Sequence, residues 1–162
     1  MRVPLNNEKV LSVFVMTPII KEVWRNSNYA FGIHSGEELE ADPALGLSGE
    51  CDFIFTANTK STHIVSPIFA LVEAKYEQFD AGITQATAQL LGVQIVNQRE
   101  GKILPELWGE AANGREWFFF KLVDKTVTQH VTSFQQSNLP MVLGAWKIVI
   151  EKSLQMAKNV SI

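Results

Sequence analysis

The sequence has little of several features that would assign a chain to a well-known class. It contains one cysteine, Cys51, among 162 residues, so we expect neither a disulfide framework nor a cysteine-based zinc site within one chain. A chain without cysteine pairs fits a reducing compartment, and we expect a cytoplasmic protein. Its apolar runs are shorter than the roughly 18 residues that cross a bilayer, so we expect no membrane partner.

An excess of positive charge is also missing. Fourteen Lys and Arg stand against seventeen Asp and Glu, which gives a net charge of −3. Binding of nucleic acid through bulk positive charge is therefore disfavoured, although a local basic strip remains compatible with this total. The sequence lacks a glycine-rich phosphate loop and a Gly-x-Ser-x-Gly turn, so NTPase and serine-hydrolase functions have no support.

What the chain does have is enough apolar material for a core. Hydrophobic residues make up 46 % of it, and its length suits one domain. Asn7 is a plausible N-cap for the first helix, which Pro18 should kink or split. The pattern of apolar residues predicts an α/β or α+β fold, with a mixed sheet flanked by helices. Helices are expected over residues 7–26, 81–97 and 139–158, strands over 29–35, 51–56, 64–76, 104–109, 117–123 and 126–134, a loop over 35–49 and a turn over 111–114.

Charged residues lie where the most apolar strand ends. This strand finishes in Val72-Glu73-Ala74-Lys75, with apolar residues before it and polar residues after it. Side chains two positions apart on a strand share a face and lie roughly 6–7 Å apart along the chain. Asp52 lies on the preceding predicted strand. If the two strands are neighbours, Asp52 and Glu73 converge at one end of the sheet.

Such a group of residues has the chemistry of a divalent-metal site. Two carboxylates and the backbone carbonyl of Ala74 are oxygen ligands of the kind that Mg²⁺ or Mn²⁺ prefers. The ion can hold phosphate oxygens and acidify a water molecule. Lys75 would then place a positive charge beside the attacking water or the phosphate. Phosphodiester hydrolysis needs these elements because the nucleophile and the substrate are both anionic.

The pattern resembles the PD-(D/E)XK nuclease superfamily, which has the restriction-endonuclease-like fold. The residues that carry the resemblance are Gly49-Glu50-Cys51-Asp52, then Glu73-Ala74-Lys75 beginning twenty-one positions after Asp52, then Gln85 on the next helix. Residues 69–97 are similar to small stand-alone members related to the restriction subunit of type I systems. The resemblance covers roughly residues 8–123 and implies one nuclease-like domain over residues 1–162.

The resemblance also implies roles for individual residues. Asp52 and Glu73 would bind the metal, Lys75 would assist the nucleophile, and Gln85 or Gln89 would orient the site from the following helix. The first helix in many members adds a metal-binding glutamate, for which Glu8 and Glu22 are both candidates. We favour Glu22, because it lies nearer the helix end that feeds the sheet. The family's proline before the first aspartate is replaced by Cys51, which we expect to face away from Asp52 and pack in the core.

Two functions therefore remain open at the level of the sequence. The first is a magnesium-dependent nuclease that hydrolyses phosphodiester bonds, most readily in DNA. For this nuclease both a homodimer and a complex with a partner subunit remain open. The second is a catalytically silent module of the same fold that binds nucleic acid or a protein partner. Asp52, Glu73 and Lys75 could instead form an ordinary surface ion pair at a strand end, with no catalytic function. Candidates for a basic strip that contacts phosphates are Arg99, Lys102, Arg115, Lys121 and Lys125.

Overall fold

The computed structural model describes residues 6–76 and 79–160, which form a seven-stranded mixed sheet flanked by helices. The strand order is β1-β2-β3-β4-β5-β6, and β7 pairs with β5 beside β6. This confirms the predicted mixed sheet between helices. Within the described ranges, no helix is long and apolar enough to cross a membrane. The strands are β1 (Gly32–Asp42), β2 (Leu47–Thr56), β3 (Ile68–Ala74), β4 (Leu107–Ala112), β5 (Glu116–Val123), β6 (Thr126–Gln129) and β7 (Phe134–Gln135).

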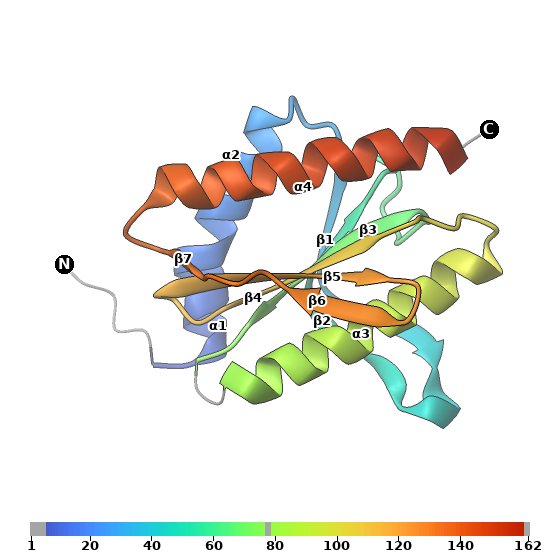
Figure 1. Cartoon of the computed structure of the whole chain (residues 1–162), viewed down its shortest axis with the longest axis horizontal. Coiled ribbons are helices and arrows are strands. Elements are labelled where there is room, and N and C mark those ends of the chain that lie inside the picture. Colours follow the sequence, from blue (N-terminus) through green and yellow to red (C-terminus); the bar gives the residue numbers. More distant parts are fainter. Residues whose placement is uncertain (1–5, 77–78, 161–162) are drawn as a thin grey trace.

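Two long helices cover the two faces of the sheet. Helix α3 (Phe79–Arg99) lies along one face, and helix α4 (Leu139–Val160) lies along the other (Figure 1). The indole of Trp146 anchors α4, since its ring centroid lies 5.3 Å from those of both Phe55 and Phe119. Strand β3 runs between these layers with all seven residues buried. It pairs antiparallel with β2 and parallel with β4, as its continuous apolar run predicts for a central strand.

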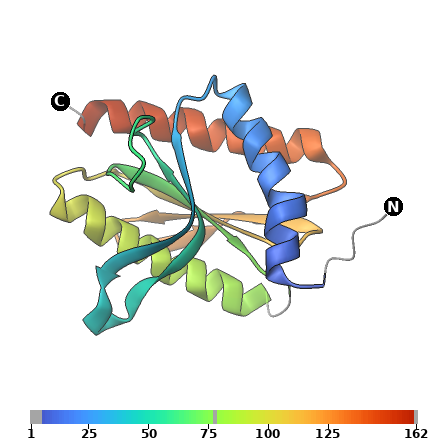
Figure 2. The ribbon, with the colours of Figure 1, turned by 180° about the vertical axis from the view of Figure 1, so that it is seen from behind.

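The first helical segment runs along the back of the molecule in three pieces (Figure 2). These are α1 (Glu8–Leu11), a π-helical turn over Ser12–Met16, and α2 (Thr17–Asn26). Asn7 caps the segment, because its side chain accepts a hydrogen bond from the Val10 N–H at 2.9 Å. Pro18 stands in the first turn of α2, where its missing N–H is tolerated. The predicted cap is confirmed; at Pro18 the segment stays helical, and it changes from a π-helical turn to α-helix just before this residue.

The hairpin of β1 and β2 is longer than the sequence predicted. Residues 35–49 were expected to form a loop, but β1 and β2 stay paired from Gly32 opposite Thr56 to Asp42 opposite Leu47. The loop prediction is wrong because two apolar residues in this polar stretch, Leu39 and Ala41, are buried. A Cβ added at Gly92 of α3 would lie 3.0 Å from the Cβ of Ala41, so the hairpin packs closely against α3.

The last part of the sheet also differs in detail from the expected elements. Strand β4 continues through Ala112, so the predicted turn at 111–114 is shorter and lies around Gly114, which has a φ of 84°. The predicted strand at 126–134 is two short strands, β6 and β7, separated by a bend. Both short strands pair with β5, one at each end of it. These differences leave the ends of β2 and β3 unaffected.

Candidate functional site

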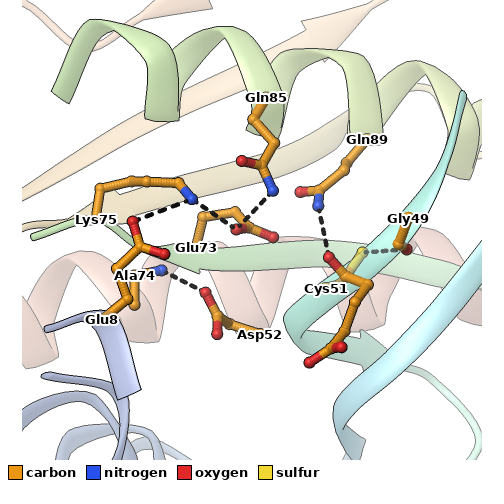
Figure 3. A network of polar contacts seen from close by, with 10 residues as sticks. Glu8, Gly49, Cys51, Asp52, Glu73, Ala74, Lys75, Gln85 and Gln89 are labelled. Carbon is orange, nitrogen blue, oxygen red and sulfur yellow. Dashed lines mark hydrogen bonds and ion pairs between the residues drawn. The ribbon is translucent and has the colours of Figure 1, made fainter. Parts of the chain in front are cut away.

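The predicted acidic residues meet where β2 and β3 lie side by side (Figure 3). Asp52 is on β2 and Glu73 is on β3, two antiparallel neighbours. The Asp52 Oδ2 atom accepts a hydrogen bond from the Ala74 N–H at 2.8 Å, which fixes this carboxylate against the end of β3. The structure therefore brings Asp52 and Glu73 together, as the strand pattern predicted.

Lys75 lies just beyond the end of β3 and completes the group. Its Nζ atom is 4.0 Å from the Glu73 Oε2 atom and 3.4 Å from the Glu8 Oε1 atom. The Lys75 side chain is 13 % exposed, whereas the Glu8 side chain is 50 % exposed. The ammonium group is thus held between an inner and an outer carboxylate.

Helix α3 shows why the lysine can take this position. A Cβ atom added at Gly82 would lie 2.3 Å from the Lys75 Cγ atom, which is too close for two carbon atoms. The glycine therefore makes room for the stem of Lys75. Gly82 is not among the site residues predicted from the sequence. A glycine within a predicted helix lowers the stability of the helix, so its presence can indicate a position where a neighbouring side chain needs the space. This is the feature of the sequence that could have identified Gly82.

Two glutamines one helical turn apart on α3 hold the ends of these strands. The Gln85 Nε2 atom donates to the Glu73 Oε2 atom at 3.3 Å. The Gln89 Nε2 atom donates to the backbone carbonyl of Glu50 at 3.2 Å, two residues before Asp52. The sequence left open which glutamine belongs to the site. Gln85 donates to the Glu73 carboxylate, and Gln89, which donates to the neighbouring backbone, also lies against Glu73.

Burial raises the pKa values of the two acids. Glu73 is 2 % exposed, and burial, assisted by the charge of Asp52, raises its pKa to about 7. Burial also raises the pKa of Asp52, although the Ala74 N–H and the charge of Lys75 act in the opposite direction. The Glu73 Oε1 atom is buried and has no hydrogen-bond partner among the described residues. An additional positive charge beside this pair would relieve both effects.

The donor set suits a hard divalent ion that retains other ligands. Among the described residues, no group of three or more His, Cys, Asp and Glu side chains is arranged to hold a metal. Mg²⁺ does not require such a group, because it commonly binds through one or two carboxylates together with waters and substrate phosphates. Asp52 and the unpartnered Oε1 atom of Glu73 fit that requirement. The carbonyl of Ala74 stays a predicted ligand.

The preference for Glu22 over Glu8 is wrong. Glu22 lies near the far end of α2, and its carboxylate binds Arg25 through contacts of 2.6 and 3.0 Å. Fourteen residues separate it from Glu8, which is about 20 Å along a helix. The direction of the segment is opposite to the one we assumed. Its N-terminal end meets β3, and this brings Glu8 to Lys75.

Cys51 is buried beside the acids and takes no part in their contacts. Its Sγ atom faces the Gly49 carbonyl oxygen at 3.9 Å. Burial, followed by the negative charge of Glu73, raises the pKa of this thiol to about 12. The thiol therefore stays protonated at neutral pH and is not a nucleophile. Its burial agrees with the expected packing role.

Comparisons with known proteins give no relative for this chain: no family model matches it, and neither the curated proteins nor the solved structures contain a match. Function must therefore be inferred from the residues themselves. The central observation is the meeting of Asp52, Glu73 and Lys75 at the ends of two neighbouring strands.

Proposed function

We propose that this protein is a divalent-metal-dependent nuclease of the PD-(D/E)XK type, which hydrolyses phosphodiester bonds in DNA. One observation carries the proposal: the buried Glu73, the half-buried Asp52 and a mostly buried lysine converge at one strand end, with an oxygen of Glu73 left unpartnered. The order of elements supports it. A helical segment, strands β1 to β3, helix α3 and strand β4 follow one another as in the restriction-endonuclease-like fold.

Asp52 and Glu73 would hold Mg²⁺ or Mn²⁺. When bound, such an ion neutralises charge on a phosphate group and lowers the pKa of water. The protein's contribution is to keep both carboxylates aimed at one place. The Ala74 N–H fixes Asp52, and the Gln85 amide restrains Glu73.

Lys75 would stabilise negative charge at the reacting phosphate. Its ammonium group is mostly shielded from water, and a charge in such an environment interacts more strongly than one in bulk solvent. Gly82 sets the path of its side chain across α3. Glu8 sits on the solvent side of the ammonium group and competes with an incoming phosphate for it. Productive binding of a substrate then requires that Lys75 exchange Glu8 for the phosphate.

Cleavage of supercoiled plasmid and of single-stranded DNA in Mg²⁺ or Mn²⁺ tests the proposal. The substitution Glu73→Gln keeps the size of the side chain and removes its charge, so we expect cleavage to fall by at least about 100-fold. Glu22→Gln is the matched control, since this carboxylate lies at the far end of α2 and its partners, Arg25 and Asn26, belong to the same helix. Equal cleavage by the wild type and Glu73→Gln would contradict the proposal.

A second candidate is a catalytically silent module of the same fold that binds a protein partner. The observation in its favour is the row of exposed acids on the β1–β2 hairpin, which includes Glu38, Glu40 and Glu50. Such a surface suits a basic partner better than a phosphate backbone. Under this alternative the wild type would cleave no substrate in the presence of either metal, and Glu73→Gln would leave partner binding unchanged.

A further inference from the structure

An apolar groove lies on the face of the sheet that α4 covers, whereas the acids contact α3 on the other face (Figure 1). Its volume is about 440 Å³. Aromatic side chains from the sheet form one wall and aliphatic side chains from α4 form the other. They include Trp108, Phe119 and Phe134 from the sheet and Met141, Ile148 and Val149 from α4. A groove of this size with such a lining is typical of a binding site for a small apolar ligand.

The α4 wall of this groove presents apolar surface to solvent. Met141 is 54 % exposed and Ile148 is 59 % exposed, and their spacing of seven residues puts both on the same side of the helix. A Cβ atom added at Gly144, which lies between them, would meet no described atom within 4 Å, so the groove is open there. Apolar side chains gathered in one open groove indicate a surface that binds another molecule.

Two lysines give the Trp108 end of the groove a net positive charge. The Nζ atoms of Lys121 and Lys152 lie 5.9 and 5.7 Å from the centre of the Trp108 ring. The Glu106 carboxylate lies 3.7 and 3.4 Å from the same two ammonium groups. Two positive charges and one negative charge leave one positive charge, which an anionic group on a ligand would neutralise. Both lysine side chains are partly exposed, so a ligand can reach them.

We propose that this groove binds the hydrocarbon chain of a free fatty acid, whose carboxylate lies beside Lys121 and Lys152. The charge of the site matches such a ligand, because the cations lie at one end only. Neither an acid nor a lysine or arginine is among the described residues that line the rest of the groove. The proposal goes beyond the proposed nuclease function and does not depend on it, since none of these residues contacts Asp52 or Glu73 in the described structure.

The polar groups of the lining favour a hydrocarbon chain over an extended peptide. The Trp108 indole N–H already donates to the Glu106 carboxylate at 3.2 Å. The His130 Nδ1 atom lies 2.9 Å from the carbonyl oxygen of Thr132. An extended peptide would bring an N–H and a C=O group with every residue, and each of these needs a partner when it is buried. A hydrocarbon chain has no such groups, so an apolar groove satisfies it completely.

The dimensions of the groove suit a chain of medium length. Trp108 pairs with Lys121 of β5, and Phe134 pairs with Trp117, four residues away on the same strand. The two ends are therefore about 13 Å apart. The volume equals that of roughly fifteen water molecules, and a methylene group occupies nearly as much space as one water molecule. A chain of about twelve carbons fits this space, with its carboxylate at the Trp108 end.

Isothermal titration of dodecanoate into the full chain at pH 8, below the concentration at which it forms micelles, tests the inference. We expect one saturable site per chain. Octanoate should bind at least tenfold more weakly, because each buried methylene group raises the affinity roughly fourfold. Dodecyltrimethylammonium has the same hydrocarbon chain and the opposite charge, so it should also bind at least tenfold more weakly than dodecanoate.

Two variants test the two parts of the site. Ile148→Glu places a negative charge in the apolar wall at an exposed position, and Lys121→Met/Lys152→Met removes both ammonium groups while it keeps side chains of similar shape. Each should weaken dodecanoate binding at least tenfold. Lys147→Met is the matched control, since this exposed lysine of α4 lies outside the lining of the groove and pairs with Glu151. It should bind dodecanoate as the wild type does.

Absence of dodecanoate binding by the wild type would overturn the inference, as would binding that survives Ile148→Glu. Equal affinities for dodecanoate and dodecyltrimethylammonium would also overturn it, and would indicate an apolar surface that a protein partner covers. Thermal melts of each variant establish that the fold is intact. Asp52→Asn/Glu73→Gln should bind dodecanoate as tightly as the wild type. Loss of binding in this variant would place the ligand at the acids and contradict the assignment to the groove.

Discussion

Asp52 and Glu73 lie in surroundings that disfavour their charged forms when no cation is bound. The pKa of each is raised, chiefly by burial; the charge of Asp52 raises the pKa of Glu73 further, and the charge of Glu8 raises that of Asp52. In the unfolded chain both carboxyls ionise at ordinary acidic pH. Above about pH 7 the folded protein must therefore keep two adjacent charges that water would otherwise solvate, so this pair lowers stability.

Removal of one charge should stabilise the protein while it abolishes cleavage. For a pKa raised from 4.5 to about 7, linkage predicts a cost of order 3 kcal/mol at alkaline pH. We therefore expect Glu73→Gln to melt at a higher temperature than the wild type at pH 8 without divalent metal. Calorimetric melts measure this directly. A lower melting temperature for Glu73→Gln at pH 8 would argue that Glu73 stabilises the fold through an ion pair with Lys75.

At the residue scale, the sequence predicted what depends on local pattern. Asp52, Glu73 and Lys75 could be placed together because a buried strand turns polar at its end, and neighbouring strands share that end. The choice between Glu8 and Glu22 could not be made in this way. It depends on which end of a helix packs against the sheet, and contacts between distant segments decide that.

Helix α3 shapes the site with a small residue as well as with polar ones: Gly82 leaves room for Lys75, and Gln85 donates to Glu73. Gly82→Ala would place a methyl group on the stem of Lys75. We expect this variant to lose at least tenfold in cleavage, because the ammonium group must move, although alanine favours a helix more than glycine does. Gly144→Ala on α4 is the control, since its added Cβ meets no described atom within 4 Å. It should keep full activity and gain up to about 1 kcal/mol of stability.

Loss of the first helix cap should affect both stability and the outer side of the site. Asn7→Ala removes the hydrogen bond to the Val10 N–H, which we expect to cost about 1 kcal/mol in urea unfolding. Because Glu8 follows directly and contacts Lys75, fraying there should change the Michaelis constant for DNA cleavage more than the turnover rate. An unchanged Michaelis constant in a destabilised Asn7→Ala variant would mean that Glu8 has no influence on substrate entry.

The long hairpin shows why elements were harder to predict than the site. The polar stretch around Gly36 and Glu38 has neither an alternating pattern nor strong strand formers, so it was predicted as a loop. Its structure comes from pairing with β2 and from burial of Leu39 against α3. Strand β3, by contrast, could be predicted from its own residues. Its continuous apolar run is buried on both faces only if the strand lies in the middle of a sheet.

Glu110 on β4 affects the stability of the whole molecule, because it should make the folded protein less stable as the pH rises. It is fully buried, and neither carboxyl oxygen has a partner among the described residues. Burial raises its pKa well above 4.5. Its contribution to stability is therefore complete below about pH 4.5 and is lost as the pH rises toward its pKa in the folded state. Asp52 and Glu73 act in the same direction.

The expected result is a melting temperature that falls between pH 5 and pH 9. Glu22 and Glu116, whose pKa values are lowered, act in the opposite direction, but both carboxylates are partly open to solvent and contribute little. Glu110→Leu should reduce the slope, because it replaces an unpartnered acid with an apolar side chain of similar size. Glu110→Gln keeps the polar atoms and should also flatten the slope. If both variants reproduce the wild-type slope, Glu110 is ionised in the folded state.

The most direct test of the central claim is an isothermal titration of Mn²⁺ into the wild type, Asp52→Asn/Glu73→Gln and the control Glu22→Gln at pH 8. We predict one saturable site in the wild type and in the control, weakened at least tenfold in the double variant. An isotherm that is the same in the wild type and the double variant would contradict the assignment of Asp52 and Glu73 as a divalent-metal site.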